Sequence, residues 1–80
     1  MKDSKSVFSI KEYGEIHIHL KEQMEKRGLT RNYLAKAVNT RFEVIDKWYR
    51  DDVEKLDLDI LARICYVLDC SPADLITYDD

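Results

Sequence analysis

A chain of 80 residues can bury one compact core but not a core with a separate catalytic module, so we expect a single domain. Apolar residues make up 45% and charged residues 36%, with two Gly and one Pro, which favours a helix-rich folded domain over a disordered or β-rich one. The net charge of −3 excludes a uniformly basic protein, so any affinity for a polyanion must come from a local patch.

Positive charge is concentrated in the middle of the chain. Residues 30–50 carry five basic and two acidic side chains, a charge of +3, and residues 1–29 carry +1. Residues 51–80 carry nine acidic and two basic side chains, a charge of −7. A polyanion is therefore expected to dock on the central segment.

The first residues carry no sign of export or membrane insertion. Residues 1–12 are polar and show no sustained period, so residues 1–14 are expected to form a flexible leader before a domain at 15–80. No apolar run approaches the roughly 18–20 residues that cross a bilayer, and the N-terminus lacks the apolar segment of an export signal. We expect no membrane association and a cytoplasmic protein.

The first structured segment shows two overlapping patterns. Residues 15–18 alternate polar and apolar side chains like a short strand, whereas Leu20 and Met24 lie on one face of a helix. We interpret this as an extended segment near 15–18 and a helix over about 18–27. Gly28 is the natural left-handed stop of that helix.

Two short helices are predicted next, at 30–38 and 41–49. Thr30 is a good N-cap for the first, because its hydroxyl can accept a hydrogen bond from the free amides of the next turn. Asn39 tolerates the left-handed conformation of a tight turn. Inward side chains are expected to be Leu34, Ala35, Val38, Val44, Ile45 and Trp48, and the second helix then presents Phe42, Glu43, Asp46 and Lys47 outward.

The C-terminal third predicts two more helices. A charged connection over 50–56 can still bury Val53 and Leu56, and Asp57 then caps a helix that runs to about Asp69. Its apolar stripe consists of Leu58, Leu61, Ile64, Cys65 and Leu68. The sequence Ser71-Pro72-Ala73-Asp74 specifies a last short helix, which carries Leu75 and Ile76.

The two central helices, joined by a turn of about three residues, have the arrangement of a helix-turn-helix motif. Four segments resemble the Cro/repressor-type helix-turn-helix transcriptional regulators, within which the short bacterial and phage variants are the nearest. They are 29–35 (LTRNYLA), 44–49 (VIDKWY), 58–65 (LDILARIC) and 70–75 (CSPADL). The resemblance spans about residues 16–78.

This resemblance implies an all-α, five-helix, lambda-repressor-like domain without a cofactor. It also implies DNA contacts from the start of the second helix and the outer face of the third, here Arg31, Asn32, Arg41, Phe42, Glu43, Asp46 and Lys47. The basic residues among them, together with Arg50, suit phosphate or guanine. The two acids could accept from cytosine amino groups, and Phe42 could contact a thymine methyl.

Three residues depart from the pattern of this family. Arg31 stands where glutamine is usual, Asn39 where glycine is usual, and Arg41 where a small capping residue is usual. In addition, Glu43 and Asp46 place two carboxylates on the third helix, near the expected phosphates. Non-specific affinity for DNA should therefore be low, and binding should depend strongly on salt.

Other chemistry is weakly supported. His17, His19, Cys65 and Cys70 could in principle ligate zinc, but their spacing is not that of a zinc knuckle, and core or surface positions explain them more simply. The cysteines are expected to be buried thiols rather than a disulfide. Packing roles are also expected for Tyr33, Tyr49, Tyr66 and Tyr78. Without a phosphate loop, a recognisable nucleophile or paired carboxylates, we expect no enzyme, and no small-molecule ligand is evident.

Two hypotheses of function follow. The first is a sequence-specific double-stranded DNA-binding regulator, a repressor, that acts as a homodimer on half-sites about 34 Å apart. The alternative is a helix-turn-helix-derived protein interaction module, such as an antirepressor or a complex subunit. Candidate dimer surfaces are the C-terminal helix around Leu75, Ile76 and Tyr78, and the Ile16/Ile18 strand, which could instead pair with the C-terminal tail of its own chain.

Overall fold

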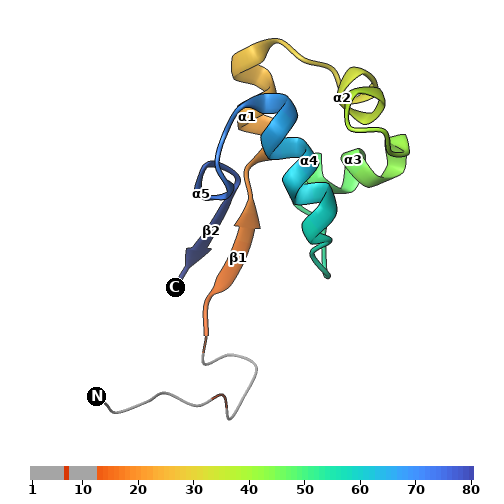
Figure 1. The fold of residues 1–80 in the computed structure, drawn as a ribbon. Helices are drawn as coiled ribbons and strands as arrows, with labels where there is room; N and C mark the ends of the chain where they lie inside the picture. Colours follow the sequence, from red (N-terminus) through yellow and green to blue (C-terminus); the bar gives the residue numbers. More distant parts are fainter. Residues whose placement is uncertain (1–6, 8–12) are drawn as a thin grey trace.

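The computed structural model describes residue 7 and residues 13–80, and it contains five helices and a two-stranded sheet (Figure 1). The elements in order are β1 (Glu15–Ile18), α1 (Leu20–Arg27), α2 (Arg31–Ala37), α3 (Phe42–Tyr49), α4 (Leu58–Leu68), α5 (Pro72–Leu75) and β2 (Ile76–Asp79). This confirms the expected five-helix fold with a short N-terminal strand. Most of the expected leader, residues 1–6 and 8–12, lies outside the described residues.

Local signals set the helix ends as expected. Gly28 ends α1 in the left-handed region at φ +66°. Thr30 caps α2, since its side-chain oxygen accepts a hydrogen bond from the amide of Tyr33 at 3.1 Å. Asp57 caps α4 in the same way, and Asn39 adopts φ +57° in the turn after α2.

One apolar core holds all five helices together. Trp48 of α3 is 3% exposed, which confirms that it is a core residue. Burial of these side chains removes apolar surface from water and is the main stabilising contribution to such a fold. The core consists of Ile18, Leu20, Met24, Leu34, Ala35, Val38, Ile45, Trp48, Ile60, Leu61, Ile64, Leu68 and Leu75.

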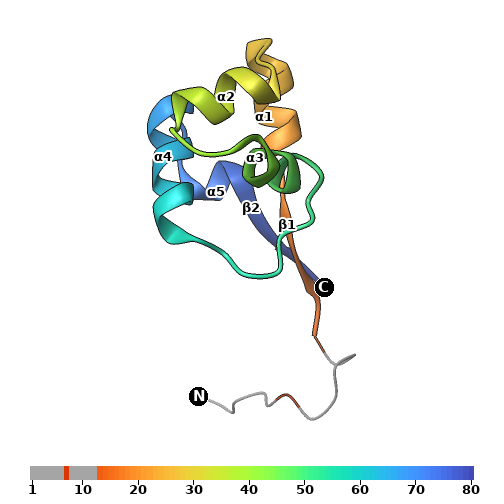
Figure 2. The same cartoon turned by 90° about the vertical axis from the view of Figure 1, so that its right-hand side faces the viewer.

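The two strands join the ends of the described chain, at a distance from α2 (Figures 1 and 2). They are antiparallel, with Ile16 opposite Tyr78 and Ile18 opposite Ile76, so β1 does pair with the C-terminal tail of its own chain. Just before β1, a Cβ on Gly14 would lie 2.0 Å from the carbonyl oxygen of Asp79. Only glycine permits this close approach.

Several expectations of burial are wrong. Leu58 is 70% exposed, because it is the first residue of α4 and the first turn of this helix extends beyond the core. Leu56 is 43% exposed, whereas Val53 does pack partly against the core. Tyr66, at 88% exposure, and Tyr33, at 56%, point into solvent instead of packing.

The C-terminal segment also differs from expectation. Leu75, the last residue of α5, is fully buried and cannot form a dimer surface. Ile76 leaves the helix and begins β2, since the chain turns extended directly after Leu75. Cys65 and Cys70 are free thiols that are half-buried rather than buried, and burial raises the pKa of the Cys70 thiol.

Candidate nucleic-acid interface

The helices α2 and α3 form a helix-turn-helix unit, and residues 38–41 connect them (Figure 2). The amide of Thr40 donates to the carbonyl of Ala35 at 2.9 Å, which closes the end of α2. Arg41 occupies the N-cap of α3 in an extended conformation, but its side chain makes no capping hydrogen bond. Because it makes no capping bond and is exposed, the side chain of Arg41 is available to an external partner, although Ser, Thr, Asp or Asn at this position would stabilise α3 better.

The side chain of Arg63 in α4 binds the turn between α2 and α3. Its Nη1 donates to the carbonyl oxygens of Val38 and Asn39, each at 3.1 Å. Its Nη2 also pairs with Asp59 one turn earlier, at 2.6 Å. These bonds fix the turn to the core helix α4, and sequence reasoning missed them because the partners lie 24 and 25 residues apart.

The outer face of α3 is open to solvent. Arg41, Phe42, Glu43 and Lys47 are exposed, and Asn32 is exposed at the start of α2. In the part of the chain that the structure describes, no carboxylate pairs with Arg41 or Lys47. The two cations are therefore available to an external anion.

Asp46 does not point freely outward as expected. Its side chain is 22% exposed and binds two arginines, Arg31 from α2 at 2.6 Å and Arg50 after α3 at 3.1 Å. Partial burial acts to raise the pKa of Asp46, but the hydrogen bonds from Arg50 and Arg31 prevail and lower it. The carboxylate therefore stays ionised and connects the two helices.

Arg31 also contacts two aromatic rings of α3. Its guanidinium carbon lies 4.6 Å from the ring centre of Tyr49 and 5.7 Å from that of Phe42. These residues, with Leu29, Thr30 and Asn32, line a shallow hollow between the start of α2 and one side of α3. The expected site residues Arg31, Asn32 and Phe42 thus meet at one place.

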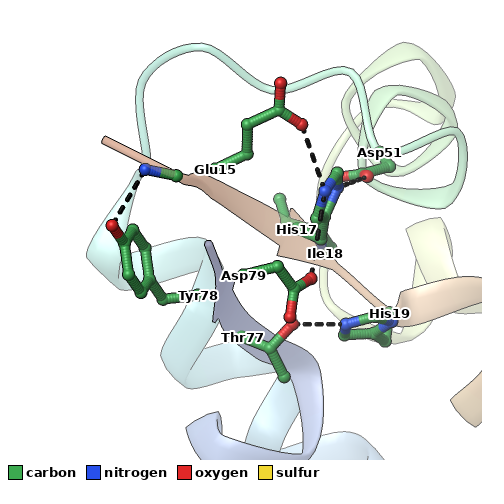
Figure 3. A network of polar contacts seen from close by, with 9 residues as sticks. Glu15, His17, Ile18, His19, Asp51, Thr77, Tyr78 and Asp79 are labelled. Carbon is green, nitrogen blue, oxygen red and sulfur yellow. Dashed lines mark hydrogen bonds and ion pairs between the residues drawn. The ribbon is translucent and has the colours of Figure 1, made fainter. Parts of the chain in front are cut away.

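A polar cluster ties the sheet to the end of α3 (Figure 3). Nδ1 of His17 lies 2.7 Å from Oδ2 of Asp51, and the Ile18 amide donates to Oδ1 of the same carboxylate at 2.7 Å. The hydrogen bond to Asp51 raises the pKa of His17 above its ordinary value. Sequence reasoning missed this pair because its partners lie 34 residues apart; Asp51 adopts the left-handed conformation, at φ +57°.

The four zinc candidates are not brought together. His17 binds Asp51, and His19 lies 2.7 Å from the Thr77 hydroxyl, whereas the amide of Cys70 bonds to the carbonyl of Cys65 after α4. Among residue 7 and residues 13–80, no three His, Cys, Asp or Glu side chains are grouped as a metal site. Within the same residues, no helix is long and apolar enough to cross a membrane.

Comparison with known proteins identifies the family. The model of the Cro/C1-type HTH DNA-binding domain matches residues 19–80, which include all five helices and every core residue except Ile18. The chain belongs to this family. A Cro/C1-type HTH domain binds DNA, so this chain is a DNA-binding domain and not an enzyme.

Solved structures share the fold of this Cro/C1-type domain. A proposed DNA-binding protein from Bacteroides fragilis superposes with a TM-score of 0.69 at 21% identity, over 79% of this chain and 100% of that chain. The transcriptional regulator VanUg also gives 0.69, at 19% identity, over 95% and 97% of the two chains. No curated protein matches the sequence.

Proposed function

We propose that this Cro/C1-type domain reads double-stranded DNA with α3 in a major groove and represses transcription by occluding a promoter. The observation that carries the proposal is the exposed outer face of α3, where Arg41 and Lys47 have no acidic partner among the described residues. An α-helix with its side chains is about 10–12 Å in diameter, so α3 fits a major groove about 12 Å wide.

The side chains on this face divide into two roles. Arg41 and Lys47 are proposed to meet phosphates, together with Asn32 at the start of α2, because exposed cations and amides bind phosphate oxygens without regard to sequence. Glu43 is proposed to accept from a cytosine amino group, and Phe42 to contact a thymine methyl. Base preference would then come mainly from the first turn of α3.

A homodimer is part of this proposal, because two copies on a two-fold axis would read half-sites about 34 Å apart. With Leu75 buried, the surviving surface is the outer part of the sheet, where Ile16 is 61% and Tyr78 56% exposed. Exposed apolar side chains at such positions suit a contact between subunits. A cytoplasmic location is an expectation of the same proposal.

The protein interaction module is the rival function. The acidic C-terminal half and the exposed Glu43 favour it, because carboxylates repel phosphate. Retention on mixed duplex DNA separates the two functions. The DNA proposal expects retention at low salt that falls steeply as salt rises, and no retention at any salt would leave only the rival function.

Selection from a random duplex pool tests recognition by α3. Wild type is expected to enrich a palindromic sequence, and Lys47→Ala should bind that sequence more weakly with the salt dependence reduced by about one phosphate contact. Glu43→Ala should change the preferred base at one position. Lys26→Ala is the matched control, because Lys26 is an exposed cation near Asp74 of α5 and away from α3, and it should bind like wild type.

A further inference from the structure

The carboxylate of Asp46 lies within an interface that should repel acids. We propose that Asp46 is a positioning residue, which holds Arg31 so that its guanidinium is already oriented toward a DNA phosphate. This inference rests on the proposed function, since it explains how Arg31 is oriented for a phosphate contact before DNA binds. It also explains why an acid on α3 can favour DNA binding.

Arg31 is held by one stripe of α3. Phe42, Asp46 and Tyr49 are four and three residues apart, so their side chains follow one face of the helix. The Asp46 carboxylate accepts from Nη1 of Arg31, while the rings of Tyr49 and Phe42 lie 4.6 and 5.7 Å from the guanidinium. An acceptor and a stacking partner together fix both the position and the plane of the group.

The arrangement leaves donors for a second acceptor. A guanidinium carries five N–H donors, and among the described residues only Nη1 of Arg31 donates to the protein. The Arg31 side chain is 41% exposed, and it lines the open hollow beside Asn32. A phosphate at this hollow could therefore bind Arg31 without breaking its bond to Asp46.

The carboxylate of Asp46 binds two arginines at once, one on α2 and one just after α3. Oδ1 of Asp46 accepts from Arg31 of α2, and Oδ2 accepts from Nε of Arg50, just after α3. Ordering two long side chains before DNA arrives removes an entropic cost that binding would otherwise carry. Arg50 also pairs with Asp52 at 3.6 Å, so the connected group of two arginines and two aspartates is neutral, and the unused N–H donors of Arg31 are what a phosphate would meet.

Simple electrostatics and positioning predict opposite signs for one substitution. If Asp46 only added negative charge, then Asp46→Asn would strengthen binding to any duplex. If Asp46 orients Arg31, the same change weakens binding, although it removes a negative charge. Glu25→Gln is the matched control, because Glu25 is an exposed acid of α1 that makes no ion pair among the residues described and has no proposed role in DNA recognition.

Binding of the selected duplex should be measured for wild type, Asp46→Asn, Glu25→Gln and Arg31→Ala, and for the double variant Arg31→Ala/Asp46→Asn. Asp46→Asn is expected to weaken binding about three- to tenfold, whereas Glu25→Gln, which also removes one negative charge, should not weaken binding. In the Arg31→Ala background, Asp46→Asn should weaken binding less than about twofold, because the guanidinium that Asp46 positions is then absent.

Each outcome decides the question. If Asp46→Asn binds DNA as tightly as wild type, or more tightly, the positioning role is wrong, but the proposed function still stands. An equal loss with and without Arg31 also overturns it, because Asp46 would then act through overall stability, which the unfolding midpoint of each variant reports. If wild type binds no duplex at low salt, the proposed function fails, and the positioning role fails with it.

Discussion

Replacing Arg63 tests how the helix-turn-helix unit is held to the core. Arg63→Ala removes two hydrogen bonds to the carbonyl oxygens of Val38 and Asn39, each 3.1 Å long. A hydrogen bond from a charged group contributes about 1.5–3 kcal/mol when it is well shielded, but the Arg63 side chain is 41% exposed and water can replace part of it. We therefore expect a loss of about 1–2 kcal/mol in the free energy of unfolding.

Thermal unfolding followed by circular dichroism measures this loss. In a domain of this size, 1 kcal/mol corresponds to about 4–8 °C, so the midpoint should fall by about 5–15 °C. Asp59→Asn is the matched control, because it removes the ion pair of Arg63 with a carboxylate that is 68% exposed, and one acid from the first turn of α4, but keeps both bonds to the carbonyls. It should cost at most about 0.5 kcal/mol. DNA affinity should also fall in Arg63→Ala, since the turn then holds α2 and α3 less firmly.

Two results would refute the reasoning. A shift of about 2 °C in the unfolding midpoint corresponds to a few tenths of a kcal/mol. If the midpoint of Arg63→Ala lies within about 2 °C of wild type, the hydrogen bonds from Arg63 to the two carbonyls do not stabilise the fold. If Asp59→Asn is as destabilising as Arg63→Ala, the ion pair and not the carbonyl bonds carries the effect.

Three further predictions concern pH and capping. The hydrogen bond to Asp51 raises the pKa of His17 above 6.5, so this stabilisation is complete below pH 6.5 and is lost as pH rises through the folded-state pKa. The unfolding midpoint should thus fall between about pH 6 and 8 in wild type more than in His17→Gln, and equal slopes would contradict this. Arg41→Ser supplies the missing cap of α3 and should raise stability by about 0.5–1 kcal/mol while weakening DNA retention; unchanged retention would remove Arg41 from the interface. Thr30→Ala loses the bond from the Tyr33 amide and should cost about 1 kcal/mol in urea unfolding, and a cost near zero would show that the cap is dispensable.

Features that depend on a few consecutive residues could be predicted from the sequence. Thr30, Asn39 and Gly28 act on the backbone next to them, so their residue types alone indicate a cap, a turn and a stop. The 3.6-residue period likewise identified the core of α3, including Trp48.

Exposure at the ends of elements could not be predicted. Leu58 continues the apolar period of α4 but begins the helix, and a period does not reveal where the neighbouring core stops. Tyr66 has an apolar ring and yet lies on the outer face of α4, because a single residue type does not determine which face is buried. Both errors came from using a local pattern to infer a tertiary contact.

The pairs that organise the candidate interface were also missed. Asp46 lies 15 residues from Arg31, and His17 lies 34 residues from Asp51, so no helical or strand period relates the partners. Sequence reasoning therefore placed Asp46 among the groups that read bases, whereas the structure shows its carboxylate bound by arginine. The charge of a side chain can be known from the sequence, but its partner depends on the fold.

Backbone amide chemical shifts during titration with the selected duplex test the central claim most directly, since each residue of the domain reports separately. We predict the largest shift changes in α3 (Phe42–Tyr49) and at the start of α2. In β1 and β2, added DNA should cause little change beyond the shifts that dimerisation alone produces in the absence of DNA. Changes that concentrate on the sheet and leave α3 unaffected would contradict recognition by this helix.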